Sequence, residues 1–91
     1  MTNAEVAAVF REIAGLLLKK KESWFKVRAY RRAAETIEGL PEPVAVLLAE
    51  HRLRQVPGVG EAIEKKVAEL VSTGRLEFLE RLRAEAAERE S

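Results

Sequence analysis

The sequence predicts an all-α protein, a compact array of four to five short helices. Apolar residues recur at helical spacing through most of the 91 residues, and no stretch alternates long enough to form a strand. Glycines and prolines divide the chain into segments of helical length. Because 47% of the residues are hydrophobic, the chain can fill one modest core. We therefore expect one domain over 1–83 and a polar tail over 84–91.

Two helices are predicted in the first half of the chain. Thr2 and Glu5 have the spacing of a capping box, and the apolar pattern that follows predicts a helix over 3–20. A second helix is expected to begin between 23 and 26 and to stop before Gly39, because a glycine followed closely by proline is typical of a helix end. Its apolar positions are Phe25, Tyr30, Ala33, Ala34 and Ile37.

Three further segments complete the predicted fold. Pro43 suits the first turn of a short helix that continues through Leu48. The stretch 56–60, Val-Pro-Gly-Val-Gly, predicts a tight turn in which both glycines adopt positive φ. A helix over 61–72 follows, with Gly74 as its stop, and a fifth helix is expected to fade after Arg83. The apolar positions of these last two helices are Ile63, Val67, Leu70, Val71, Leu76, Leu79 and Leu82.

Composition excludes several classes of function. The chain has no cysteine, which removes disulfides, thiolate metal sites and cysteine nucleophiles. The single histidine, His51, cannot form a multi-histidine metal site within one molecule. The apolar stretch 6–18 is interrupted by Arg11 and Glu12 and is shorter than the about 20 residues that span a membrane. Without a basic segment at its start, the chain is expected to be cytoplasmic, with no membrane partner.

A run of basic residues over 19–32 is the first candidate for function. Seven cations stand there against Glu22 alone, although the whole chain carries a net charge of only +1. Trp24, Phe25 and Tyr30 are interleaved with them, and cations among aromatic rings are typical of single-stranded nucleic acid binding. The alternative is a solvated helix face with Phe25 and Tyr30 in the core. The cations are Lys19, Lys20, Lys21, Lys26, Arg28, Arg31 and Arg32.

The glycine turn before the fourth predicted helix is the second candidate. Closely spaced glycines at a helix N-terminus let backbone N–H groups face outward, where the helix dipole favours an anion such as phosphate. Val56 and Val59 would anchor the turn in the core. The alternative is an ordinary connection between two helices.

A pair of lysines in the fourth predicted helix is the third candidate. At 100° per residue, Lys65 lies opposite the apolar stripe, whereas Lys66 lies about 80° from its centre, at the edge of the core. Partial burial at such an edge favours a neutral, nucleophilic amine. The alternative is a lysine that covers apolar surface with its stem and keeps its charge in water.

These segments together resemble the N-terminal deoxyribose-phosphate lyase domain of family X DNA polymerases, a helix-hairpin-helix domain, in its polymerase beta-like, bacterial form. The resemblance runs from Asn3 to about Arg83. The motifs that carry it are Asn-Ala-Glu-Val-Ala at 3–7, Phe-Lys-Val-Arg-Ala-Tyr-Arg-Arg-Ala-Ala at 25–34, Val-Pro-Gly-Val-Gly at 56–60 and Ser-Thr-Gly-Arg-Leu at 72–76.

The resemblance implies roles for particular residues. Lys66 stands at the position of the family's Schiff-base lysine. Lys26, Tyr30 and Arg54 stand at positions that surround a 5′-phosphate in the family. The basic run, the glycine turn and the lysine pair add Arg28, Arg31, Gly58, Gly60 and Lys65 to the residues expected to bind DNA phosphates. Main-chain carbonyls of Arg54, Val56 and Val59 are expected to hold a Na⁺ or K⁺ ion, and no other cofactor is required.

Some positions depart from the family's pattern. Phe25 replaces a histidine found in polymerase beta, and Ala62 replaces a lysine of its phosphate pocket. Glu64 stands where alanine is usual and would repel a phosphate. A 5′-phosphate should therefore bind more weakly here. The chain contains no aspartate, so it lacks the metal-binding carboxylates of the polymerase active site and is not a polymerase by itself.

The function expected is a sequence-nonspecific DNA-binding module of DNA repair, which recognises gapped, nicked or single-stranded DNA through its phosphates. A repair polymerase or nuclease would be its protein partner. Two alternatives remain: a 5′-deoxyribose-phosphate lyase acting through Lys66, and a helical adaptor that binds proteins.

Overall fold

The structure, a computed structural model, describes residues 1–90, except for the side chain of Glu90. Over these residues the chain is all-α, as predicted, and contains no strand. The elements in chain order are α1 (Asn3–Lys19), α2 (Trp24–Glu38), α3 (Val44–Ala49), the 3-10 helix η1 (Leu53–Gln55), α4 (Glu61–Thr73) and α5 (Glu77–Glu90).

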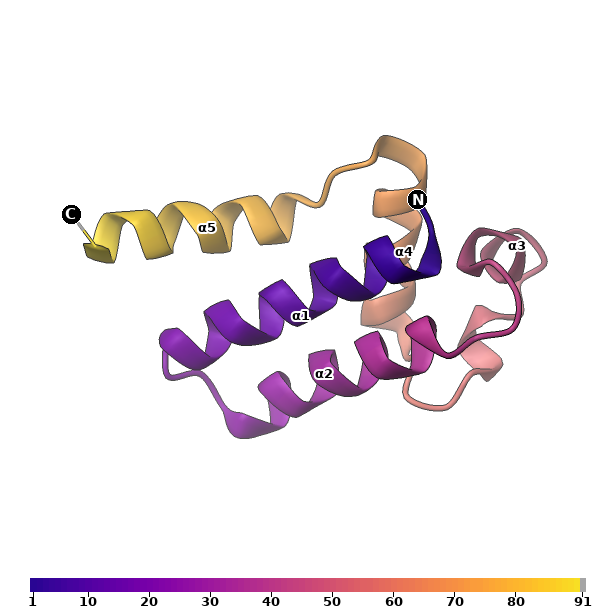
Figure 1. The fold of residues 1–91 in the computed structure, drawn as a ribbon, viewed down its shortest axis with the longest axis horizontal. Helices are drawn as coiled ribbons and strands as arrows, with labels where there is room; N and C mark the ends of the chain where they lie inside the picture. Colours follow the sequence, from indigo (N-terminus) through magenta and orange to yellow (C-terminus); the bar gives the residue numbers. More distant parts are fainter. Residues whose placement is uncertain (91) are drawn as a thin grey trace.

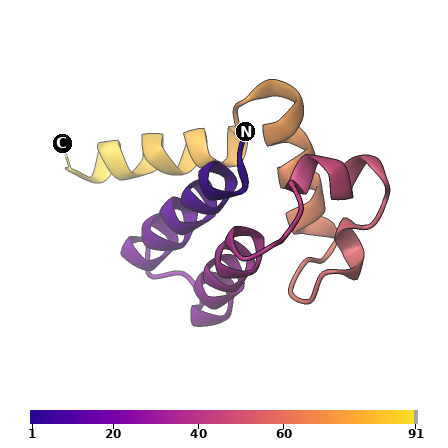
Figure 2. The same cartoon turned by 45° about the vertical axis from the view of Figure 1, so that its right-hand side comes forward.

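The helices α1 and α2 lie side by side and antiparallel, and they form the most extensive helix pair of the molecule (Figure 1). The short elements α3 and η1 gather with α4 at one end of this pair, and α5 runs along α1 toward the opposite end (Figure 2). One core joins all of them, and its largest fully buried side chains include Phe10, Ile13, Ile37, Leu53 and Leu70.

The predicted start of α1 is confirmed in detail. The Glu5 amide donates to Thr2 Oγ1 at 3.1 Å, and the Thr2 amide donates back to the Glu5 carboxylate at 2.8 Å, which makes the capping box. The Asn3 side chain makes two hydrogen bonds that its position in the sequence did not predict. Its side chain accepts a bond from the Val44 amide at 2.7 Å and donates to the Glu42 carbonyl at 2.8 Å. The start of α1 is thereby joined to the start of α3, where Pro43 occupies the N-cap position rather than the first turn.

The prediction that the fifth helix fades after Arg83 is wrong, because α5 continues to Glu90. The buried Leu79 and Leu82 of α5, with Leu76 just before it, confirm the predicted apolar face. Two ion pairs hold the polar half of α5 against α1: the Arg83 guanidinium bonds both oxygens of Glu12 at 2.6 Å, and Lys20 Nζ lies 2.8 Å from Glu85. Ser91, the last residue of the predicted tail, lies outside the described residues.

Two helices end on a residue other than glycine in the left-handed region. Lys21 has φ 62° after α1, and His51 has φ 56° after α3. At the second end, the His51 amide donates to the Leu48 carbonyl at 3.1 Å and the Arg52 amide to the Leu47 carbonyl at 2.8 Å. This pair of bonds is the Schellman motif, whose left-handed position is most often glycine.

We predict that His51→Gly stabilises the protein. A side chain in the left-handed region costs about 1–2 kcal/mol, and the extra chain entropy of an unfolded glycine offsets about half of that gain. The free energy of unfolding in urea should therefore rise by about 0.5–1 kcal/mol. Glu50→Gly is the matched control, since Glu50 has φ −91°, and should lower it. A loss of stability in His51→Gly would contradict this interpretation of the turn.

Candidate nucleic-acid interface

The helix α2 presents most of the basic run on its surface. Its N-terminus is capped by Ser23, whose side-chain oxygen accepts a bond from the Phe25 amide at 3.2 Å. Its buried residues form one narrow stripe, Val27, Ala33, Ala34 and Ile37. At 100° per residue, Arg28 and Arg32 point away from that stripe and are exposed, as expected of a cationic face.

The aromatic residues of α2 have different environments. Phe25 is 81% exposed and Trp24 is 52% exposed, whereas Tyr30 is half-buried and packs against the core. The alternative that placed both rings in the core is therefore wrong for Phe25, although Tyr30 does pack there. Phe25 lies three and seven residues before Arg28 and Arg32, on the same outward face of the helix. A flat apolar ring thus stands in solvent beside two guanidinium groups.

The predicted tight turn at 56–60 is confirmed, and its two glycines differ in backbone conformation. The Val59 amide donates to the Val56 carbonyl at 3.0 Å, which closes a four-residue turn. Pro57 at the second position and Gly58 with φ 88° at the third are the pattern of a type II turn. Val59 is buried, so it anchors the turn in the core.

Gly60 does not have the predicted positive φ. It has φ −98° and ψ −171°, an extended conformation that any residue adopts, and it occupies the N-cap position of α4. A Cβ atom on Gly60 would meet no atom within 4 Å. The need for glycine in this turn therefore rests on Gly58 alone.

The turn packs directly against α2. A Cβ atom on Gly58 would lie 3.3 Å from Arg32 Nε and 3.5 Å from Arg32 Cγ and Cδ. The missing side chain of Gly58 is what lets the Arg32 stem cross the turn. The structure thus joins the basic face of α2 to the hairpin, two features that are separate in the sequence. Arg32 belongs to the basic run but was not among the predicted phosphate-binding residues.

The N-terminus of α4 is less favourable to an anion than the glycine pattern suggests. Glu61 and Glu64 lie in its first turn, where they interact with the positive end of the helix dipole themselves. Lys65 Nζ lies 3.1 Å from the Glu61 carboxylate, and its hydrogen bond lowers the Glu61 pKa. Arg54 is 3.9 Å from the Glu64 carboxylate. The predicted phosphate ligands Arg54 and Lys65 each have a competing carboxylate.

Lys66 lies at the edge of the core, as predicted, and contacts two aromatic rings. Its Nζ is 5.8 Å from the ring centroid of Tyr30 and 4.9 Å from that of Phe78, and the two rings stack with centroids 6.1 Å apart. Ring faces attract an ammonium group. Phe78 comes from α5 and was not among the predicted site residues, because the leucines of that helix define its apolar face and nothing local in the sequence links Phe78 to Lys66.

The other predicted phosphate ligands of α2 lie in two places, some around the same rings and one away from them. Lys26 and Tyr30 line one pocket of about 450 Å³ together with Phe78, and Lys26 lies 3.6 Å from Glu22. Arg31 is not part of this group. Its guanidinium lies 5.3 Å from the centroid of Trp24, on the side of α2 that faces α1, where it lines a surface groove with Gly15.

The carbonyls expected to bind a monovalent cation belong to the same turn. The Val56 carbonyl accepts the Val59 amide, which leaves one of its two lone pairs for a cation. A cation held jointly by the Arg54, Val56 and Val59 carbonyls stays a prediction. Among the described residues no group of three His, Cys, Asp or Glu side chains could hold a metal ion.

Comparison with known families agrees with this geometry. The family model of the helix-hairpin-helix domain matches residues 1–76, which end just before α5. Helix-hairpin-helix domains generally bind DNA. No helix within residues 1–90 is long and apolar enough to cross a membrane.

We predict that the two glycines of the turn respond differently to substitution. Gly58→Ala should lower the free energy of unfolding by about 1–3 kcal/mol, because it forces a side chain into positive φ and against Arg32. Gly60→Ser should leave stability unchanged or raise it, since serine is a good N-cap residue. Urea denaturation of both variants measures the difference, and equal losses would contradict it.

One structural family is identified by the match over residues 1–76, together with the turn at 56–60 and the basic face of α2. The chain belongs to the helix-hairpin-helix domain family.

Proposed function

We propose that the protein is a sequence-nonspecific DNA-binding module that recognises gapped, nicked or single-stranded DNA through its phosphates. The observation that carries the proposal is the contact between Arg32 and Gly58. This contact brings the hairpin turn next to Arg32 of α2, so one DNA strand can touch both. A role in DNA repair, with a repair polymerase or nuclease as protein partner, belongs to the same proposal.

The distribution of ion pairs supports a phosphate ligand. Arg11, Arg52, Arg75 and Arg83 are each bonded to a carboxylate. By contrast, Arg28, Arg31 and Arg32 form no ion pair within residues 1–90. The basic face of α2 therefore holds cations that the protein itself does not neutralise, and phosphates are their natural partners.

The exposed ring of Phe25 supports a preference for DNA with unpaired bases. Burying such a ring is favourable, and an unpaired base offers a flat face on which it can stack. Arg28 and Arg32 on the same face could hold the adjoining phosphates. An intact duplex offers the phosphates but no free base face, so it should bind less tightly.

We predict that binding depends on the outward arginines of α2. Wild-type protein should bind a fluorescently labelled gapped duplex with micromolar-range affinity that falls as salt rises. Arg32→Ala and Arg28→Ala should weaken binding equally for different base sequences, and each should reduce the salt slope by about one. Arg52→Ala is the matched control, because Glu42 and Glu50 already neutralise Arg52.

The outcomes of this experiment separate the proposed function from a protein-binding adaptor. An adaptor has no need for phosphate contacts, so its chain would show no binding to any DNA even at low salt. Absence of binding by the folded wild-type protein would therefore reject the DNA-binding proposal. Equal losses in Arg52→Ala and Arg32→Ala would reject the role assigned to the α2 face.

A 5′-deoxyribose-phosphate lyase is the second candidate, because Lys66 lies beside Tyr30 at a partly open position. Its neutral amine would attack C1′ of the open-chain abasic sugar, and loss of water would give an iminium ion. Removal of a C2′ proton would then break the bond between C3′ and its oxygen, which leaves with the phosphate.

We predict weak but detectable trapping of the protein on 5′-deoxyribose-phosphate DNA by sodium borohydride. Trapping should be weak because Lys66 must give up its attraction to the rings of Tyr30 and Phe78 before the amine can react. Lys66→Ala should abolish it, and Lys65→Ala is the matched control. Equal trapping by the wild type and Lys66→Ala would exclude Lys66 as the nucleophile, and no trapping by either would reject the lyase.

A further inference from the structure

The helix α5, which lies beyond the matched family domain, forms a groove with α1. Two pockets lie along it, of about 450 Å³ and about 240 Å³, and both are lined by Lys20, Leu82 and Glu85. The two pockets therefore adjoin, and the ion pair of Lys20 with Glu85, at 2.8 Å, belongs to the wall that they share. We call the two together the α1–α5 groove.

The groove begins at the candidate site. Its larger pocket contains the stacked rings of Tyr30 and Phe78, against which Lys66 packs. From Phe78 the lining residues of α5 continue at spacings of three or four to Arg89. At about 1.5 Å per residue this is a path of about 16 Å, room for a few nucleotides of a single strand.

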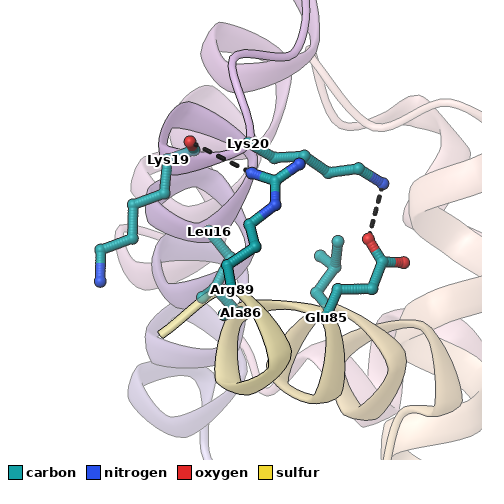
Figure 3. A pocket seen from close by; sticks show the side chains of 7 residues that line it. Leu16, Lys19, Lys20, Glu85, Ala86 and Arg89 are labelled. Carbon is teal, nitrogen blue, oxygen red and sulfur yellow. Dashed lines mark hydrogen bonds and ion pairs between the residues drawn. The ribbon is translucent and has the colours of Figure 1, made fainter. Parts of the chain in front are cut away.

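Side chains from both helices give the groove a positive charge. Figure 3 shows Lys20 reaching from the end of α1 to Glu85, and Arg89 reaching from α5 toward the Lys19 carbonyl, while the ammonium of Lys19 points away. Arg81 lines the larger pocket. The hydrogen bond from Lys20, together with the charges of Arg89 and Arg81, lowers the pKa of Glu85. Two carboxylates, Glu22 and Glu85, thus line the groove against five cations, which are Lys19, Lys20, Lys26, Arg81 and Arg89.

The floor of the groove is apolar. Leu16, Leu82 and Ala86 line the smaller pocket, and Leu17 joins the two rings in the larger one. An apolar and aromatic floor under a cationic rim is the arrangement that single-stranded nucleic acid requires, with bases on the floor and phosphates at the rim. A double helix would not fit this path, because its bases are already paired and stacked.

We propose that the α1–α5 groove binds a single-stranded DNA tail that leaves the gap or nick at the hairpin. The inference rests on the proposed function and extends it, because it assigns α5 a share in substrate choice. DNA with such a tail binds more tightly than the same gap with flush ends. When the tail binds, one of its phosphates replaces the Glu85 carboxylate as the partner of the surrounding cations.

The test compares two labelled gapped duplexes, one with flush ends and one with a single-stranded tail of about five nucleotides, by fluorescence anisotropy. Wild-type protein should bind the tailed DNA roughly threefold or more tightly. The double variant Arg81→Ala/Arg89→Ala should lose this advantage and keep its affinity for the flush gap. Arg11→Ala, which removes one positive charge from the surface between α1 and α2, should keep the advantage. Circular dichroism verifies that each variant stays helical.

A variant that binds DNA more tightly gives a second readout, because a partly unfolded variant would lose affinity rather than gain it. Glu85→Gln removes the competing carboxylate, so it should strengthen binding of the tailed DNA more than of the flush gap. Glu50→Gln makes the same change of charge on the far side of the molecule and should favour neither DNA. Equal affinity of the wild type for both duplexes, or a tail advantage that survives in Arg81→Ala/Arg89→Ala, would overturn the inference. Failure to bind either duplex would instead reject the proposed function.

Discussion

The narrow apolar stripe of α2 is the constraint on which the arrangement of the site depends. Only Val27, Ala33, Ala34 and Ile37 of this helix are buried, and the two alanines let α2 lie close to α1. Such a stripe permits one rotation of the helix about its axis, because any other would bury arginine and expose isoleucine. That rotation fixes the outward direction of Phe25, Arg28 and Arg32. A larger side chain at Ala33 or Ala34 would disturb the interface as well as the core.

The hairpin and α5 complete the surface by meeting this fixed pair of helices. Gly58 brings the turn under the stem of Arg32, and Val59 holds it there from the core side. Phe78 of α5 stacks on Tyr30 of α2, and Lys66 of α4 lies over the Phe78 ring. Residues distant in sequence thus meet in two clusters, one where the hairpin packs against Arg32 and one where Lys66 contacts the two rings. Because Glu61 and Glu64 compete with phosphate at the hairpin, we expect the arginines of α2 to take the larger share of phosphate binding.

Much of the fold could be predicted because its signals are local. The spacing of apolar residues predicts five helices, with every end but the last within a few residues of its observed position, and the Pro-Gly pair predicts the turn with Gly58 at positive φ. The positive φ predicted for Gly60 is wrong, because the sequence alone does not distinguish a glycine in extended backbone from a glycine in the left-handed region. For Phe25 the sequence leaves a core position and an exposed position open, since its spacing fits the helix and only the packed structure shows which side faces α1. The helical end of α5 depends on Glu12 and Lys20, ion-pair partners far away in sequence.

The most direct test of the account is a titration of ¹⁵N-labelled protein with a gapped duplex, followed by amide and arginine side-chain NMR signals. The account predicts that Gly58 and the Nε–H of Arg32 shift together at the same DNA concentrations, with Phe25 and Arg28, because one DNA strand touches the turn and the α2 face. Signals of Ala45 and Val46 in α3 should remain in place. Shifts confined to α3, or shifts of Gly58 that leave Arg32 unchanged, would contradict a joint surface of the hairpin and α2.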